Sequence, residues 1–298
     1  MNPFSSDTFV SLVDQLGPAV VRIEAPRQGG TTGLLWSDDG LIVTAHHALR
    51  RDESIRVVIG SNEPRPAQLL GRDPATDLAV LRVDLEGLDD PPAAPKWREV
   101  GAVGVAEVGL ALARPGQSIR AALGLVAVVG ERLHTPRGRA LTPYVELDRV
   151  LPRGFSVAPF VDLQGQVVGL ATAGLAPDTT VLLTAGNIRE AVEAIVEHGR
   201  VPQGFLGVGV SPARLPSVVR ESVGQGRALA IVGVAEGGPA ADAGLLVGDL
   251  ILAVDGGAVQ SPSGLRAQLA DRAGQPVALR LLRGGKTTEI EITAGERR

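Results

Sequence analysis

Three kinds of side chain in this sequence have the chemistry that serine-dependent acyl transfer requires: an imidazole, a carboxylate and a hydroxyl. His46 and His47 follow the apolar run LIVTA, and Asp77 precedes the apolar run LAVL. Ser156 stands in the stretch RGFSVAP. A hydroxyl is a poor nucleophile until a neutral imidazole accepts its proton, and a carboxylate holds that imidazole in the required tautomer and orientation. The hydroxyl of Ser156 is therefore either an attacking nucleophile or an ordinary turn hydroxyl.

The order of these residues along the chain limits the classes of serine hydrolase that they could form. The order His, Asp, Ser is that of chymotrypsin-like proteases and differs from the order in subtilisins and α/β-hydrolases. The other two histidines have plainer interpretations. His198 falls in the last turn of an expected helix, where a cation suits the helix dipole, and His134 lies in a polar segment expected to be an exposed loop.

The elements that must position these residues are mostly short strands. TGLLWSDDGLIVTA predicts two strands joined by an Asp39-Gly40 hairpin turn. Further apolar runs follow at regular spacing, which favours an all-β barrel or sandwich. After a Pro-rich connection at 87–97 the same rhythm resumes. We therefore expect two β lobes in series, with His46, His47 and Asp77 in the first and Ser156 in the second.

A helix and a second, smaller domain are expected to follow. The apolar residues of GNIREAVEAIVEHGR recur on one face of a helix, Asn187 with Glu190 resembles a capping box, and Gly199 suits its end. The remaining 95 or so residues contain five expected strands and one or two helices. The predicted organisation is a β domain at 1–186, a linker helix at 187–201 and a small α+β domain at 202–298.

Composition excludes several classes of function. A net charge of -4 without a basic stripe argues against nucleic acid as a partner. The absence of cysteine removes thiol chemistry and thiolate metal sites, and no metal or cofactor is implied. No apolar run reaches about 18 residues, so no membrane span is expected. The first 21 residues lack a signal-peptide pattern. The expected location is cytoplasmic if Met1 is the native start, and periplasmic or otherwise extracytoplasmic if it is not.

Five segments together carry a resemblance to a known family. They are DDGLIVTAHHAL, GRDPATDLAVLRV, FVDLQGQVVGLATA, GFLGVGV and GGPAADAGLLVGDLILAVDG. The chain resembles the HtrA/Deg family over roughly residues 8–295. The resemblance implies a mainly β fold: a two-lobed chymotrypsin-like double β-barrel followed by a small α+β PDZ domain. It also implies a serine endopeptidase that cleaves unfolded or damaged proteins, binds C-terminal peptides at the PDZ domain and forms a homotrimer.

The resemblance assigns roles to particular residues. His47, rather than His46, would be the general base, Asp77 its orienting carboxylate and Ser156 the nucleophile. The backbone N–H groups of Gly154 and Ser156 would form the oxyanion hole, which stabilises negative charge in the transition state.

This chain departs from the family around the nucleophile. The family usually reads Gly-Asn-Ser-Gly-Gly-Pro, whereas this chain reads Gly-Phe-Ser-Val-Ala-Pro at 154–159. Because a β-branched residue tolerates positive φ poorly, Val157 is expected to be extended, and Phe155 is expected either to fill a pocket or to block one. A proteolytically inactive peptide-binding or chaperone-like protein of the same fold remains the alternative. A scaffold acting only through its PDZ domain is a third interpretation.

Two binding sites are predicted. Val150, with Gly169, Leu170 and Ala171 as a wall, suggests a substrate pocket for a small aliphatic side chain, unless Val150 is simply part of the core. In the C-terminal domain, the resemblance implies a carboxylate-binding loop and an apolar pocket from the following helix, made by Phe205, Leu206, Gly207, Val208, Leu265 and Leu269.

Overall fold

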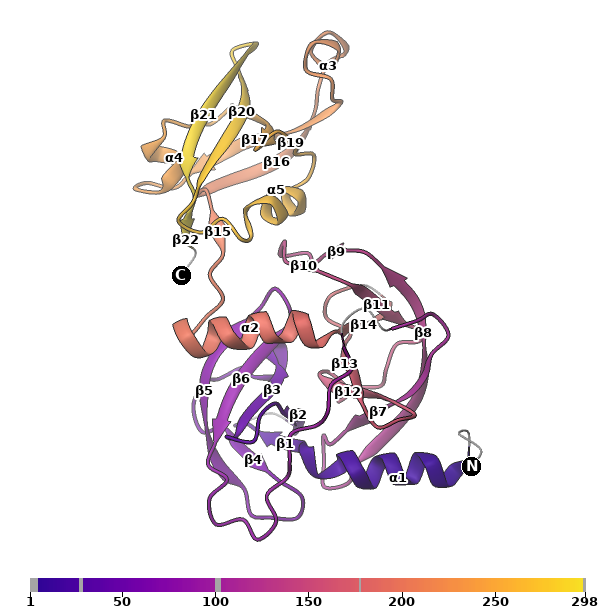
Figure 1. Cartoon of the computed structure of the whole chain (residues 1–298). Coiled ribbons are helices and arrows are strands. Elements are labelled where there is room, and N and C mark those ends of the chain that lie inside the picture. Colours follow the sequence, from indigo (N-terminus) through magenta and orange to yellow (C-terminus); the bar gives the residue numbers. More distant parts are fainter. Residues whose placement is uncertain (1–4, 27–28, 100–102, 177, 297–298) are drawn as a thin grey trace. The chain divides into compact units, whose positions relative to one another are not determined.

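The structure, a computed structural model, describes residues 5–26, 29–99, 103–176 and 178–296 of the 298-residue chain (Figure 1). Its contacts divide the chain into two compact units. The first contains residues 1–133 and 141–201, and the second contains residues 134–140 and 202–298. No helix among the described residues is both long and apolar enough to cross a membrane.

The first half of unit 1 is a closed six-stranded barrel with strand order β1-β2-β3-β6-β5-β4. Its strands are β1 (Val20–Glu24), β2 (Thr31–Leu35), β3 (Leu41–Ala45), β4 (Arg56–Val58), β5 (Arg65–Asp73) and β6 (Leu78–Val83). All five residues of β3 are buried, because this strand lies between β2 and β6 with its apolar side chains in the core. The predicted hairpin joins β2 to β3, and Gly40 supplies the positive φ of +87° that the turn needs.

The second half of unit 1 is another closed six-stranded barrel, ordered β11-β14-β13-β12-β7-β8. Its strands are β7 (Val108–Ala113), β8 (Arg120–Gly130), β11 (Tyr144–Leu147), β12 (Ala158–Asp162), β13 (Val167–Thr172) and β14 (Thr180–Leu183). The short strands β9 (Leu133–His134) and β10 (Ala140–Leu141) form a two-stranded sheet. Unit 1 also contains α1 (Ser6–Leu16), η1 (Gly17–Ala19) and η2 (His46–Ala48).

The predicted helix after the barrels is α2 (Ala185–His198), which packs on β5 and β6. Four residues of its predicted apolar face, Ile188, Ala191, Val192 and Ile195, are buried, whereas Val196 is 48% exposed. Gly199 ends the helix with a φ of +73°. The helix begins two residues before the expected position, and its capping box joins Thr184 to Asn187 rather than Asn187 to Glu190. The N–H of Thr184 donates to the Asn187 side chain, which satisfies a backbone group at the helix start.

Unit 2 is a small α+β domain built on an antiparallel sheet ordered β16-β17-β18-β20-β21, with β19 paired to β18. Its strands are β15 (Gly204–Phe205), β16 (Val208–Arg214), β17 (Arg227–Val234), β18 (Leu250–Val254), β19 (Gly257–Ala258), β20 (Pro276–Arg283), β21 (Lys286–Thr293) and β22 (Gly295–Glu296). Its helices are α3 (Ser217–Val223), α4 (Pro239–Asp242) and α5 (Pro262–Leu269). The predicted fold class, a double β-barrel followed by a small α+β domain, is confirmed.

Candidate active site

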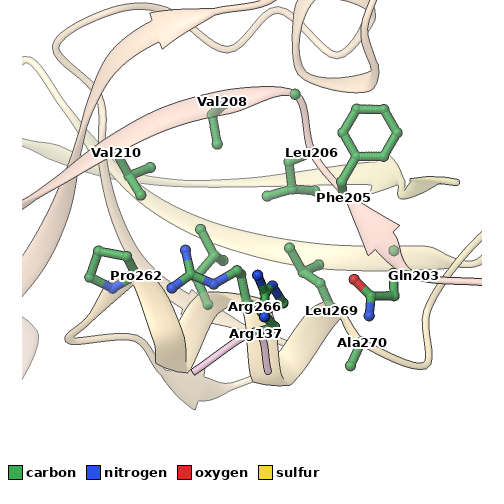
Figure 2. A pocket seen from close by; sticks show the side chains of 13 residues that line it. Arg137, Gln203, Phe205, Leu206, Val208, Val210, Pro262, Arg266, Leu269 and Ala270 are labelled. Carbon is green, nitrogen blue, oxygen red and sulfur yellow. The ribbon is translucent and has the colours of Figure 1, made fainter. Parts of the chain in front are cut away.

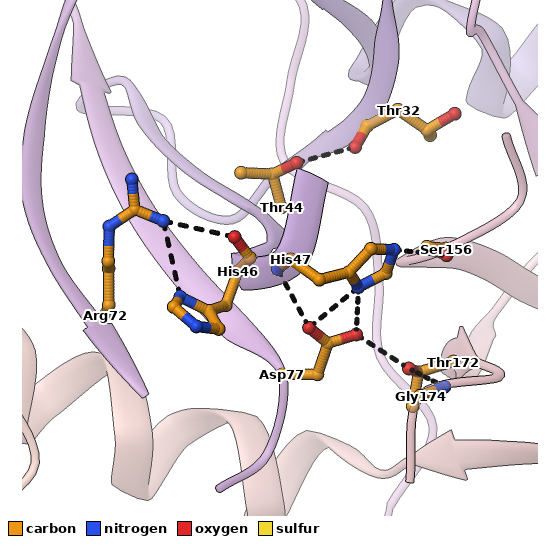
Figure 3. Close-up of polar contacts among 9 residues, drawn as sticks. All are labelled: Thr32, Thr44, His46, His47, Arg72, Asp77, Ser156, Thr172 and Gly174. Carbon is orange, nitrogen blue, oxygen red and sulfur yellow. Dashed lines mark hydrogen bonds and ion pairs between the residues drawn. The ribbon is translucent and has the colours of Figure 1, made fainter. Parts of the chain in front are cut away.

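The carboxylate of Asp77 is the most densely bonded group of the site (Figure 3). The ring Nδ1 of His47 lies 2.9 Å from its Oδ1 and 2.8 Å from its Oδ2, and the backbone N–H of His47 donates to Oδ1 at 3.1 Å. The hydroxyl of Thr172 donates to Oδ2 at 3.0 Å. Asp77 is only 6% exposed, so little water can solvate its charge. These hydrogen bonds take the place of that hydration.

The two neighbouring histidines point in different directions. The His46 ring lies beside Arg72, whose Nη1 is 3.3 Å from its Nδ1, whereas the His47 ring faces Asp77 (Figure 3). The backbone N–H of His46 donates to the backbone carbonyl of Asp77 at 2.9 Å. The turn η2 therefore holds both histidines against Asp77, the residue just before β6, and only His47 presents its imidazole to the carboxylate.

The turn before β6 explains how Asp77 reaches this position. Asp73 at the end of β5 accepts the N–H of Ala75 at 2.9 Å and the hydroxyl of Thr76 at 2.6 Å, which closes the turn. Asp77 then adopts a left-handed backbone with φ of +61°. Aspartate is among the few non-glycine residues that visit this region readily, so the motif supplies both the conformation and the carboxylate.

Ser156 comes from the second barrel and meets the far side of the same imidazole. Its Oγ lies 3.4 Å from Nε2 of His47. Because a carboxylate only accepts hydrogen bonds, Nδ1 of His47 carries the proton and Nε2 is left as an acceptor for the serine hydroxyl. The distance is long for a hydrogen bond, as is common for catalytic contacts in the absence of substrate.

The hydrogen bond that His47 donates to Asp77 raises the pKa of His47 above its ordinary value of 6.5, and the Asp77 charge adds to this effect. Partial burial acts in the opposite direction. The imidazole is therefore a stronger base than a free histidine, which favours acceptance of a proton from Ser156.

Two backbone N–H groups near Ser156 have the properties of an oxyanion hole. Neither the N–H of Gly154 nor that of Ser156 donates to another group within the part of the chain that the structure describes. Gly154 has φ of +93°, and a Cβ there would lie 2.8 Å from Cβ of Pro115. Only glycine fits this backbone and this contact, which accounts for its presence two residues before Ser156.

The residues around Ser156 differ from expectation at Val157. Its backbone has φ of +61°, so the expected extended conformation is wrong. The N–H of Val157 donates to the carbonyl of Ala171 at 2.7 Å, and its side chain is fully buried. These contacts hold a β-branched residue in a region that costs about 1–3 kcal/mol. Phe155, which is 4% exposed, packs into the core of the second barrel.

The predicted substrate-pocket residues are not gathered next to Ser156. A cavity of about 610 Å³ is lined by Gly29, Gly30, Thr31, His47, Ala48, Arg50, Arg153, Gly154 and Ser156. Val150 is 51% exposed, whereas Leu170 and Ala171 are fully buried in β13, and Gly169 pairs with Phe160 of β12. Because all six residues of β13 are buried between β12 and β14, Leu170 and Ala171 pack in the core and do not line this cavity.

The sequence did not single out Thr172, although its hydroxyl contacts Asp77. Thr172 ends β13, and its Oγ1 also accepts the N–H of Gly174 at 3.2 Å. A threonine at the end of an apolar strand carries no distinctive signal, since its partner lies 95 residues earlier in the chain. In the described residues no group of three or more His, Asp or Glu side chains is arranged to hold a metal ion.

Unit 2 contains a groove with the properties of a peptide site (Figure 2). A cavity of about 330 Å³ is lined by the loop 204–208, by Val210 of β16 and by one side of α5, including Leu265 and Leu269. Arg137, from the 134–140 segment of the same unit, and Arg266 of α5 also line it. All six predicted peptide-binding residues, Phe205, Leu206, Gly207, Val208, Leu265 and Leu269, lie around this cavity.

The backbone of the loop is oriented for an anion. The carbonyl of Leu206 accepts the N–H of Ala240, and that of Gly207 accepts the N–H of Ala235, both at 2.8 Å. The N–H groups of Leu206 and Gly207 donate to no other described residue. Since β16 is the edge of its sheet, an extended peptide could add beside it with its carboxylate at these N–H groups.

Two domain families match the chain. Residues 31–170 match the trypsin-like peptidase domain, and residues 204–294 match the PDZ domain. Fold and site thus define a chymotrypsin-like peptidase unit joined to a PDZ domain. Together with the relatives and structures described next, these two matches support a place for this chain in the HtrA/Deg family.

Curated relatives agree on the family. A "Probable periplasmic serine endoprotease DegP-like" of Brucella suis is 29% identical over 280 residues, and one of Rhizobium meliloti is 28% identical over 302 residues. These alignments cover 88% and 95% of this chain, but only 52% and 56% of the relatives. The chain therefore spans about half the length of the curated relatives it matches.

Solved structures agree over almost the whole chain. "HtrA-type protease AlgW with decapeptide" superposes with a TM-score of 0.73 at 25% identity and covers 97% of this chain and 99% of that one. "HtrA-type protease AlgW with tripeptide" gives a TM-score of 0.71 at 27% identity, with 97% of each chain covered. The serine endoprotease from Yersinia pestis has the same fold, with a TM-score of 0.75, 24% identity and full coverage of both chains.

The first prediction concerns the charge of His47. An NMR titration of its imidazole should give a pKa above 6.5 in the wild type and a lower pKa in Asp77→Asn, because the substitution removes the negative acceptor. The base must be neutral to act, so the acid limb of the pH–rate profile should lie above pH 6.5. A wild-type pKa at or below 6.5, or no decrease in Asp77→Asn, would contradict the assignment.

The second prediction concerns the strained Val157. Val157→Gly removes the backbone strain and should raise the rate of fluorophosphonate labelling by up to about tenfold. Glycine adopts the left-handed backbone without strain, so a larger fraction of the molecules should hold the loop in the conformation that presents Ser156 to His47. The unfolding midpoint should change little, because strain relief of about 1–3 kcal/mol offsets the loss of a buried valine worth about 1.5–3 kcal/mol.

Ala158→Gly is the matched control for this prediction. Ala158 begins β12 and pairs with Ala171, so its backbone is extended and glycine offers it no relief. The measurements are the labelling rate and the thermal unfolding midpoint of each variant. An equal gain from both variants would show that the left-handed backbone of Val157 is not the limiting feature.

Proposed function

We propose that this protein is a serine endopeptidase whose triad is His47, Asp77 and Ser156. The observation that carries the proposal is the continuous chain of contacts from the Asp77 carboxylate through both ring nitrogens of His47 to the Ser156 hydroxyl. Three groups from two barrels meet there in the order that proton transfer requires.

The residues divide the reaction between them. Ser156 Oγ attacks the scissile carbonyl while Nε2 of His47 takes its proton, and the resulting imidazolium is stabilised by Asp77. The N–H groups of Gly154 and Ser156 stabilise the negative oxygen of the tetrahedral intermediate. His47 then gives its proton to the leaving amine, and water hydrolyses the acyl-enzyme through the same base in a second round.

The groove of unit 2 would bind peptides by their C-termini. The loop N–H groups would hold the terminal carboxylate, β16 would pair with the peptide backbone, and Leu265 and Leu269 would contact its last side chain. The proposed substrates are unfolded or damaged proteins, which expose extended segments. The proposed assembly is a homotrimer, and the proposed location is extracytoplasmic, in keeping with relatives named as periplasmic.

The third prediction tests the nucleophile. A fluorophosphonate probe should label the wild type, should not label Ser156→Ala, and should label His47→Ala more than about 1,000-fold more slowly, because the hydroxyl loses its base. His46→Ala is the matched control: it removes the adjacent imidazole, which faces Arg72, and should leave labelling close to wild type. Absence of labelling in both the wild type and Val157→Gly would favour a proteolytically silent peptide-binding protein.

The fourth prediction tests the groove. A peptide with an apolar C-terminal residue and a free carboxylate should bind the full chain, and amidation should weaken binding by more than about tenfold, since the N–H groups lose a charged acceptor. Leu269→Ala should also weaken binding. The control is Leu246→Ala, at a residue that is 55% exposed and outside the cavity. Isothermal titration giving equal affinity for acid and amide would show that the loop is not a carboxylate site.

A further inference from the structure

Thr32 is a fully buried residue of the first barrel that touches the loop of the nucleophile. It lies in β2, and its Oγ1 donates to the backbone carbonyl of Gly154 at 2.7 Å, across 122 residues of sequence. None of the roles proposed above uses it. A threonine hydroxyl has a single proton, and here that proton goes to the residue whose N–H is a proposed oxyanion donor.

The bond fixes the one peptide unit that separates the two proposed donors. The N–H groups of Gly154 and Ser156 are separated by the peptide unit joining Gly154 to Phe155. Thr32 holds the carbonyl end of this unit, and the N–H of Phe155 donates to the carbonyl of Pro152 at 3.2 Å at the other end. With both ends held, the spacing between the two donors is fixed.

Thr32 is itself held from two further directions. The backbone N–H of Arg114 donates to its Oγ1 at 3.0 Å, and the hydroxyl of Thr44 donates to its backbone carbonyl at 2.8 Å. The buried Arg114 guanidinium donates to the carbonyls of Gly60 and Gly17, both at 3.1 Å. The segment after β7 is thereby attached to the first barrel.

This segment also limits the freedom of Gly154 from its other side. Pro115 follows Arg114, and its ring is close enough that a Cβ on Gly154 would lie 2.8 Å from Pro115 Cβ. Glycine has the widest backbone freedom of any residue, so an unrestrained Gly154 would sample several orientations of its N–H. The Thr32 hydroxyl and the Pro115 ring together restrict the N–H of Gly154 to one orientation.

We propose that Thr32 is a positioning residue for the oxyanion hole: its hydroxyl, acting through the carbonyl of Gly154, holds the two N–H donors at the spacing that a tetrahedral intermediate requires. The proposal rests on the proposed function. Donors that are preorganised in this way act on the transition state more than on the bound substrate.

Substitutions at position 32 separate the hydroxyl from the side-chain shape. Thr32→Val keeps the shape and removes the hydroxyl, and should lower kcat for casein cleavage by about 10- to 100-fold with KM within about threefold. Binding of an alkyl boronic acid, which forms a tetrahedral adduct with serine, should weaken by a similar factor. Thr32→Ser keeps the hydroxyl and should recover most of the activity. Should Thr32→Val fail to fold, Thr32→Ala compared with Thr32→Ser makes the same distinction.

Thr44→Val is the matched control, because it removes a buried hydroxyl one hydrogen bond further from Gly154. It should lower the unfolding midpoint about as much as Thr32→Val while leaving kcat within about threefold. If the two variants lower kcat equally, Thr32 contributes only to barrel stability and the proposal is overturned.

A measurement without catalysis separates this proposal from the proposed function. Amide hydrogen exchange in segment 152–158 should accelerate in Thr32→Val and stay unchanged in Thr44→Val, because only the first releases the Gly154 carbonyl. Accelerated exchange in an enzyme that no probe labels would support the positioning role and reject the protease function. Unchanged exchange in Thr32→Val would overturn the positioning role even in an active protease.

Discussion

The buried carboxylate of Asp77 is the constraint on which the rest of the site depends. A charge with so little exposure must be hydrogen-bonded, and its partners here are a backbone N–H, an imidazole and a hydroxyl. Two of them belong to His47 in the first barrel, and the third, Thr172, belongs to the second. Satisfying one carboxylate therefore fixes the ring of His47 and joins the two barrels at the point where Ser156 approaches.

The chemistry at Ser156 is divided between a well-formed dyad and a loop under strain. His47 and Asp77 meet at ordinary hydrogen-bond distances, whereas Val157 adopts a backbone that favours glycine. The loop nevertheless keeps this conformation, because the N–H of Val157 bonds to Ala171 and its side chain packs in the core. Such local strain is commonly concentrated at functional sites, where the surrounding structure over-determines the conformation.

The sequence predicted the parts of the structure that depend on local patterns. The two β lobes, the Asp39-Gly40 hairpin and the helix that Gly199 ends follow from strand spacing, turn residues and helical periodicity. The closure of both lobes into barrels was implied by the family resemblance. What could not be predicted depends on contacts between distant residues. Thr32 and Thr172 matter through partners 122 and 95 residues away, and Val157 is held left-handed by a tertiary hydrogen bond that overrides its own preference. A single sequence carries no signal for such contacts.

The open edge of β16 has a consequence for solubility. A strand with unpaired backbone groups is a template for pairing with any extended chain, including partly unfolded copies of the same protein. Proteins usually protect such edges with charge, with proline or with a covering element. Here β16 contains Pro212, and α5 lies alongside the segment that begins at Val208. Because α5 borders the groove beside this edge, we expect a single extended chain to pair there more readily than the edge of a second sheet.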